Sequence, residues 1–178
     1  PKEICKLSNL RAFKAIVYKN LDDLEHIINH ISNLHCLHIS SLAINRCNFD
    51  WINSNNSNLD VLSWVLFSRN IHELKIVDCL CKKLPDYQSH MFPDPAILAQ
   101  LKLYCTRIEE DPIGTLERLL NLRMMELGMD SFWGQDMICH SMGFSQLKHL
   151  GFHGLGNVKQ WKVDEGAMLK LSNLRIRS

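Results

Sequence analysis

Cysteine and histidine are the residues of this sequence with the most chemical potential. The chain has seven Cys and nine His, and one group places Cys79 and Cys81 between His72 and His90. Thiolates and imidazoles bind zinc, but structural zinc sites usually show a paired C-x2-C spacing, which this sequence lacks. Cys79 and Cys81 also fit interior positions of a repeat, so we interpret them as structural thiols. A zinc protein that uses both residues is the alternative.

Catalytic motifs are missing from the sequence. A nucleophilic Cys or Ser needs a neighbouring base and a third group that orients this base, and no such set stands out. All eight Gly lie at position 114 or later, and no G-x-x-x-x-G-K-[ST] phosphate loop is present. The acids at 109–111 fit a solvated helix entry, where negative charge suits the helix dipole. We expect no catalytic residue, metal ligand or cofactor, and a thiol hydrolase is the enzyme-class alternative.

Composition and charge exclude several classes. The chain has 178 residues, of which 46% are hydrophobic and 22% are charged, as in a globular protein. Its net charge of +1 argues against a nucleic-acid-binding domain, which usually carries a basic excess. No apolar run is long enough to span a membrane. The odd number of scattered Cys, without a secretory signal, favours reduced thiols in a cytoplasmic protein.

A repeat organises the chain. The pattern apolar-x-x-apolar-x-apolar occurs seven times, and its first residues are separated by 24, 37, 27, 24, 25 and 24 positions. Five of these six spacings fall in the range of leucine-rich repeats. The members of the pattern are Leu10/Phe13/Ala15, Leu34/Leu37/Ile39, Ile71/Leu74/Ile76, Leu98/Leu101/Leu103, Leu122/Met125/Leu127, Leu147/Leu150/Phe152 and Leu171/Leu174/Ile176.

The spacing predicts one short strand per repeat. Apolar and polar residues alternate at the end of each pattern, as in a strand with one buried face. Stacked repeats would align these strands in one parallel sheet over a continuous core. We therefore predict an α/β leucine-rich-repeat solenoid, or horseshoe, that fills residues 1–178 without a second domain. The predicted strands are 13–15, 37–39, 74–76, 101–103, 125–127, 150–152 and 174–176.

The segments between strands predict short helices and loops. Asn20, Asn58 and the pair Asp111-Pro112 are expected to begin helices, and residues 133–144 are expected to form a loop. The inward-facing residues would be Leu24, Ile27, Ile28, Ile31, Leu59, Leu62, Leu66, Ile113, Leu116, Leu119 and Leu120. A ladder position after each strand would hold Tyr18, Leu42, Cys79, Thr106, Asp130 and Leu155. Neither end shows a capping repeat, so we expect a segment truncated at both ends.

The concave face of the predicted sheet carries a basic excess. The strand positions that alternate with core residues hold eight Lys or Arg against two acids. This excess predicts a groove that docks an acidic protein surface, and an ordinary solvated sheet face is the alternative. The candidate binding residues are Arg11, Lys14, His35, His38, His72, Lys75, Lys102, Tyr104, Arg123, Lys148, His149 and His153.

Four stretches carry a resemblance to a known family. They are PKEICKLSNLRAF at 1–13, HELKIVDCLCKKLP at 72–85, LKLYCTRIEEDPIGTLERLLNLRMMEL at 101–127, and GFSQLKHLGFHGLGNVKQWKVDEGAMLKLSNLRI at 143–176. The sequence resembles the leucine-rich-repeat region of plant nucleotide-binding leucine-rich-repeat disease-resistance proteins of the coiled-coil type. Ser145 departs from this family's pattern, which usually has Pro at that position.

The resemblance implies a non-catalytic role in plant defence. It implies recognition of a pathogen effector or a guarded host protein, and docking to the receptor's own nucleotide-binding domain to restrain its switch. Any ADP or ATP would bind in that other domain, and no nucleic acid or membrane span is expected here. The alternative is the substrate-recognition repeat region of an F-box ubiquitin-ligase subunit.

Overall fold

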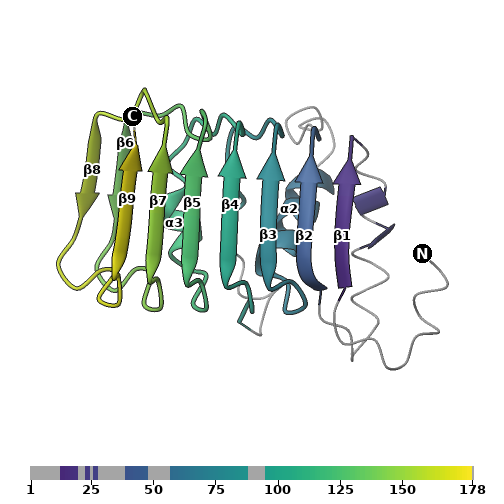
Figure 1. The fold of residues 1–178 in the computed structure, drawn as a ribbon, viewed down its shortest axis with the longest axis horizontal. Helices are drawn as coiled ribbons and strands as arrows, with labels where there is room; N and C mark the ends of the chain where they lie inside the picture. Colours follow the sequence, from purple (N-terminus) through teal and green to yellow (C-terminus); the bar gives the residue numbers. More distant parts are fainter. Residues whose placement is uncertain are drawn as a thin grey trace.

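A parallel sheet of seven strands dominates the structure (Figure 1). The computed structural model describes residues 13–19, 23–24, 26–27, 39–47, 57–87 and 95–177. The strands follow one another across the sheet in chain order, and each pair is parallel. They are β1 (Phe13–Tyr18), β2 (Ile39–Asn45), β3 (Glu73–Val77), β4 (Gln100–Tyr104), β5 (Met124–Gly128), β7 (His149–His153) and β9 (Asn173–Arg177).

The return segments cover the back of this sheet. Helices α2 (Ser57–Phe67) and α3 (Ile113–Leu116) lie behind the strands (Figure 1). Further along the chain, β6 (Asp136–Cys139) and β8 (Gln160–Val163) pair as a second, two-stranded parallel sheet. This arrangement confirms the leucine-rich-repeat solenoid that the spacing predicts.

The core forms because each strand turns two apolar residues toward the back. Leu101 and Leu103 in β4 are fully buried, as are Met125 and Leu127 in β5, while their neighbours in the strands are more exposed. The ladder pairs Leu101 with Met125, so equivalent residues of successive repeats stack directly. Buried side chains of the strands β1 to β7 and of the return segments form one hydrophobic cluster, which does not include Leu174 and Ile176 of β9.

The register of the first two strands differs from the prediction. Leu42 and Ile44, rather than residues 37–39, are the buried pair of β2, and the predicted Leu34 and Leu37 lie outside the described residues. The predicted ladder role of Leu42 is therefore wrong. Two overlapping series of alternating apolar residues occur in this segment, and the pairing of Leu42 with Leu74 shows that the later series forms the strand. In β1 the corresponding core residues are Ala15 and Val17. Between equivalent strand residues, the repeats then measure 27, 32, 27, 24, 25 and 24 residues.

The helix predictions were partly correct. Residues 23–24 and 26–27 are helical, and α2 starts one residue before the predicted cap Asn58. Asp111 lies one residue before the N-cap of α3, which is Pro112, although its Oδ1 accepts the Ile113 N–H at 2.9 Å. Pro112, however, precedes the first helical residue instead of occupying it.

Two other predictions for the return segments are wrong. Leu120 is 56% exposed because α3 ends at Leu116, so the helical face that would have turned Leu120 inward does not continue. Residues 133–144 contain β6, because the backbone of this segment pairs with the next repeat in β8. The predicted cap Asn20 lies outside the described residues, and the predicted inward residues Ile28, Ile31 and Leu59 lie outside the described side chains.

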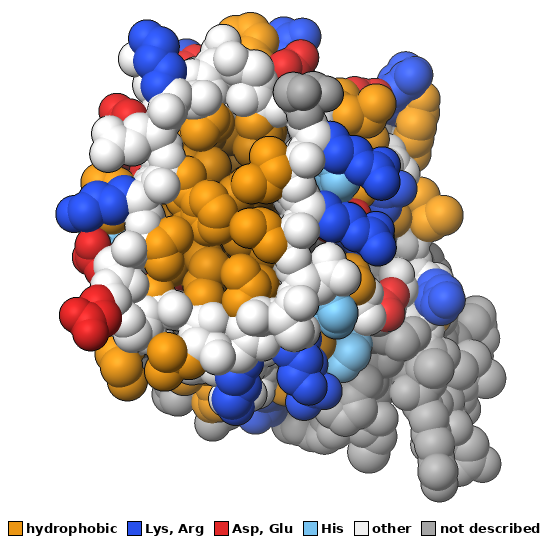
Figure 2. Space-filling model, turned by 60° about the vertical axis from the view of Figure 1, so that its left-hand side comes forward, with side chains coloured by type: hydrophobic (Ala, Val, Ile, Leu, Met, Phe, Trp, Pro, Cys, Tyr) orange, Lys and Arg blue, Asp and Glu red, His pale blue; other side chains and the backbone are white. Residues whose placement is uncertain are grey.

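The end of the solenoid that carries β8 and β9 leaves core side chains uncovered. Figure 2 shows hydrophobic side chains gathered at the centre of this end, framed by backbone. Val163, Leu174 and Ile176 are 42%, 46% and 64% exposed. The equivalent positions of earlier strands are covered by the next repeat, whereas no described repeat lies beyond β9.

Replacing Leu101 by Ala should destabilise the solenoid by about 2–5 kcal/mol, because a cavity opens between neighbouring repeats. Leu120→Ala is the matched control, with an expected cost below about 0.5 kcal/mol at an exposed site. Chemical denaturation followed by circular dichroism measures both changes. Equal losses for the two variants would contradict the described core.

Candidate protein-binding face

The outer face of the seven-stranded sheet presents three rows of side chains. Register places equivalent residues of successive strands side by side. The first row is Lys14, Ser41, Glu73, Gln100, Met124, His149 and Asn173. The middle row is Ile16, Ala43, Lys75, Lys102, Glu126, Gly151 and Arg175. The last row is Tyr18, Asn45, Val77, Tyr104, Gly128, His153 and Arg177.

Six of the twelve candidate residues lie in these rows. They are Lys14, Lys75, Lys102, Tyr104, His149 and His153. Arg11, His35 and His38 lie outside the described residues.

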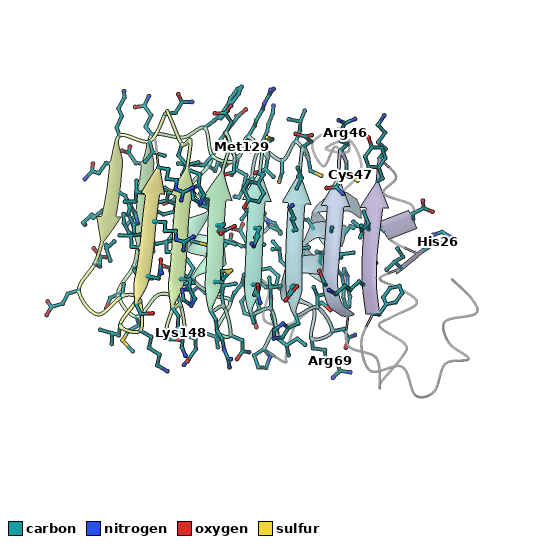
Figure 3. The ribbon with its side chains drawn as sticks, in the orientation of Figure 1. His26, Arg46, Cys47, Arg69, Met129 and Lys148 are labelled. Carbon is teal, nitrogen blue, oxygen red and sulfur yellow. The ribbon has the colours of Figure 1, made fainter. Side chains whose placement is uncertain are left out.

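The remaining candidates, His72, Arg123 and Lys148, stand in the turns before β3, β5 and β7. Their carbonyl oxygens accept backbone N–H groups of the next repeat, at 2.9, 2.8 and 3.0 Å. Figure 3 shows Lys148 at the end of the sheet where strands begin, opposite Met129 at the other end.

The basic groove predicted from the sequence does not run across successive strands. Lys75 and Lys102 are neighbours, but Arg123 and Lys148 lie at the edge, because alternation ends where the turn begins. From Lys102 the row continues through Glu126, Gly151 and Arg175. On the described outer face, five Lys or Arg stand against two acids, so the basic excess is smaller than the sequence suggests.

A cluster of polar side chains occupies the middle of the face. The Glu126 carboxylate accepts a hydrogen bond from the Tyr104 hydroxyl at 2.6 Å, and Lys102 Nζ lies 3.2 Å from the same oxygen. Burial would raise the pKa of Glu126, but these hydrogen bonds outweigh it and hold the pKa below its usual value. Lys75 Nζ lies 5.6 Å from the centre of the Tyr104 ring, as in a cation–π contact. Three successive strands thus share one connected polar network.

The thiols that could have bound metal have structural partners. Cys79 Sγ accepts the Cys47 N–H at 3.3 Å and donates to the Val77 carbonyl at 3.2 Å, while Cys81 Sγ donates to the Lys83 carbonyl at 2.9 Å. The hydrogen bond to the Cys47 side chain and burial both raise the pKa of Cys79 well above its ordinary value, so its thiolate is disfavoured. Within the described part of the chain, no three His, Cys, Asp or Glu residues are grouped to hold a metal ion.

A buried ladder follows the strands. Cys47, Cys79, Thr106 and Ser131 occupy it with at most 3% exposure, and Thr106 Oγ1 donates to the Ser131 carbonyl at 2.8 Å. The prediction of Asp130 at this position is wrong. Met129 and Asp130 both have positive φ, so the turn after β5 contains an extra left-handed residue and shifts the ladder by one.

Two features of the face were not singled out from the sequence. Ile16 and Tyr18 are 74% and 52% exposed on β1, because this strand continues to Tyr18. The predicted ladder position of Tyr18 is therefore wrong. Gly151 stands inside β7 and Gly128 ends β5, and a strand glycine often marks a close approach of other groups. Here a Cβ on Gly128 would meet the Tyr104 ring at 2.9 Å. The position of glycine in the strand pattern could have indicated both sites.

The Tyr104 hydroxyl should ionise only at unusually high pH. Burial, with the hydrogen bond to Glu126, raises its pKa to about 12. Because folding raises this pKa, the associated stability is complete below about pH 10 and is lost as pH rises through 12. Tyr104→Phe should remove a phenolate absorbance step near pH 12 that Tyr18→Phe retains. Spectrophotometric titration tests this, with circular dichroism to verify the fold, and a difference step near pH 10 would contradict it.

Comparison with known proteins places the chain in a family. A leucine-rich repeat region family matches residues 1–178. In Arabidopsis thaliana, the chain is 40% identical to the probable disease resistance protein RF9 over 108 residues, which are 60% of this chain and 10% of that protein. It is 34% identical to the probable disease resistance RPP8-like protein 4 over 149 residues, or 74% and 16% of the two chains.

A third relative is named for disease susceptibility. The chain is 37% identical to the disease susceptibility protein LOV1 of Arabidopsis thaliana over 107 residues, covering 57% of this chain and 12% of that protein. The chain thus spans only a small part of these relatives. No solved structure matches it. Among the described residues, no helix has the length and apolar character to cross a membrane. The chain belongs to the leucine-rich-repeat family and is the kind of repeat region that plant disease resistance proteins carry.

Proposed function

We propose that this chain is the protein-binding module of a plant immune receptor that acts in the cytoplasm. The observation that carries the proposal is the outer sheet face, where basic and aromatic side chains from successive strands stand in register. The relatives that are named disease resistance proteins support the biological setting. The module has no catalytic task, and its work is recognition.

The partner we infer is a protein with an acidic surface. Lys75 is exposed on β3, next to Lys102 on β4, and the Tyr104 ring offers an apolar surface beside both. Opposite charge across such a face steers association and fixes orientation. Three partners fit this chemistry: a pathogen effector, a guarded host protein, and the receptor's own nucleotide-binding domain. Nucleotide would bind only in that domain, and contact with this face would restrain its switch.

Charge reversal at the centre of the face should weaken docking. The variant Lys75→Glu/Lys102→Glu changes the local charge by four units in two neighbouring strands. Exposed ion pairs contribute about 0–1 kcal/mol each, so the double change should weaken docking by several-fold. Co-precipitation with the nucleotide-binding domain, at low and high salt, measures this effect. In the full receptor, the same variant should cause cell death without an effector.

The matched control is Arg123→Glu/Lys148→Glu, which makes the same charge change at the edge of the sheet. Circular dichroism verifies that both double variants fold. Docking that weakens only for the central pair supports the face. Equal weakening by both double variants would mean that docking depends only on the overall charge of the chain. Unchanged docking of the folded Lys75→Glu/Lys102→Glu variant would contradict docking through this face.

A further inference from the structure

Gly151 lies at the centre of a group of outer-face residues from three strands. Register places Glu126 of β5 and Arg175 of β9 directly beside it. His149 and His153 precede and follow it on the same face of β7. Because Gly151 has no side chain, the residues around it enclose a hollow of about 240 Å³. The hollow is lined by Met124, Glu126, His149, Gly151, Asn173 and Arg175, together with the core residues Met125 and Leu150.

The dimensions of this hollow suit one side chain of a partner. Adjacent strands lie about 4.8 Å apart, so the backbones of Glu126 and Arg175 are separated by about 10 Å. A Cβ on Gly151 would lie 3.1 Å from His153 Nε2 and 3.2 Å from Glu126 Cγ. Any residue other than glycine would therefore press on these two side chains and reduce the hollow. Gly151 has no positive φ, so backbone conformation does not require glycine at this position.

The charges around the hollow favour an anion. Glu126 is the only acid in β5, β7 and β9, and Lys102 and Tyr104 already bind its carboxylate. On the opposite side, Arg175 and the Asn173 amide line the hollow, and Arg177 follows on the same face. Figure 2 shows Lys, Arg and His side chains together on the flank of this end of the molecule. A guanidinium and an amide are strong hydrogen-bond donors to a carboxylate.

We propose that this hollow receives a single Asp or Glu side chain of the protein partner. The carboxylate would lie toward Arg175, Asn173 and His149, and its methylene groups would pack over Gly151 and beside Met124. This inference rests on the proposed function and specifies it, because it names a point of contact that lies apart from Lys75. The hollow would fix the position of the partner, while the central lysines attract its acidic surface.

Peptides of defined charge test the proposal. The probes are three fluorescein-labelled dodecapeptides in which Ser alternates with Glu, Gln or Lys, and the 178-residue chain is titrated with each. Fluorescence anisotropy should detect binding of the Glu peptide alone. With glycine labelled by ¹⁵N, the amide signal of Gly151 should shift during the titration. Gly114, at the back of the sheet in α3, should not shift.

Two variants address the hollow directly. Gly151→Val fills it without changing any charge, and Arg175→Gln removes one donor charge from an exposed position. Each should weaken binding of the Glu peptide, and the loss for Arg175→Gln should be about two- to fivefold, as for one exposed ion pair. Lys170→Gln is the matched control. It removes the same charge from the return segment between β8 and β9, where Lys170 bonds Gln146, and should leave binding unchanged.

Each outcome decides between the alternatives. If Gly151→Val and Arg175→Gln weaken binding of the Glu peptide and Lys170→Gln does not, the result supports the hollow. If the Val variant does not fold, the comparison of Arg175→Gln with Lys170→Gln is sufficient. Equal loss for Arg175→Gln and Lys170→Gln overturns the proposed site in favour of diffuse attraction. Stronger binding of the Lys peptide than of the Glu peptide, or no binding of the Glu peptide, would also overturn the proposed site. Docking of the nucleotide-binding domain to the Lys75/Lys102 variant is a separate measurement, so the proposed function can stand when the hollow fails.

Discussion

The parallel backbone ladder between successive repeats is the constraint on which the rest of this structure depends. It pairs Leu74 with Leu101 and Leu101 with Met125, so each repeat buries its apolar pair against the next one. Because side chains alternate along a strand, the same register also decides which residues stand on the outer face. Core and binding face are therefore two results of one pairing, and a shift of one residue would exchange them.

The backbone pairing between repeats also explains the left-handed turns that end the strands. Arg46, Asp78, Cys105 and Met129 have positive φ although none is glycine, and such a conformation costs energy. At each of these turns the residue's N–H donates to a carbonyl of the following repeat, as from Arg46 to Val77 at 2.9 Å and from Asp78 to Tyr104 at 3.1 Å. These regular hydrogen bonds offset the local strain, so the turns are held by their neighbours.

The sequence predicts the later repeats well and the earlier ones less well, for physical reasons. From β3 onward, one apolar pair per repeat can fit the strand pattern, and pairs such as Leu101 and Leu103 are the buried ones. Before β2, two overlapping apolar pairs compete, and only contact with Leu74 selects Leu42. The alternation of side chains alone could not show that Lys102 lies within the outer face and Arg123 at its edge. The residue at which a strand begins depends on pairing with the neighbouring strands. The hollow at Gly151 needs three strands at once, so no single motif indicates it.

The outer face is not uniform, and this bears on how it could recognise a protein. On β1, Ile16 and Tyr18 are exposed apolar or aromatic side chains, and Ala43 is small. Toward β9 the same rows carry Arg175 and Arg177, with Glu126 bound by Lys102 between the two regions. Apolar contact contributes affinity through burial, whereas charge contributes mainly orientation and rate. A protein that covers the whole face would need an apolar patch opposite β1 and an acidic patch opposite β9. This requirement would discriminate among acidic proteins that net charge alone could not distinguish.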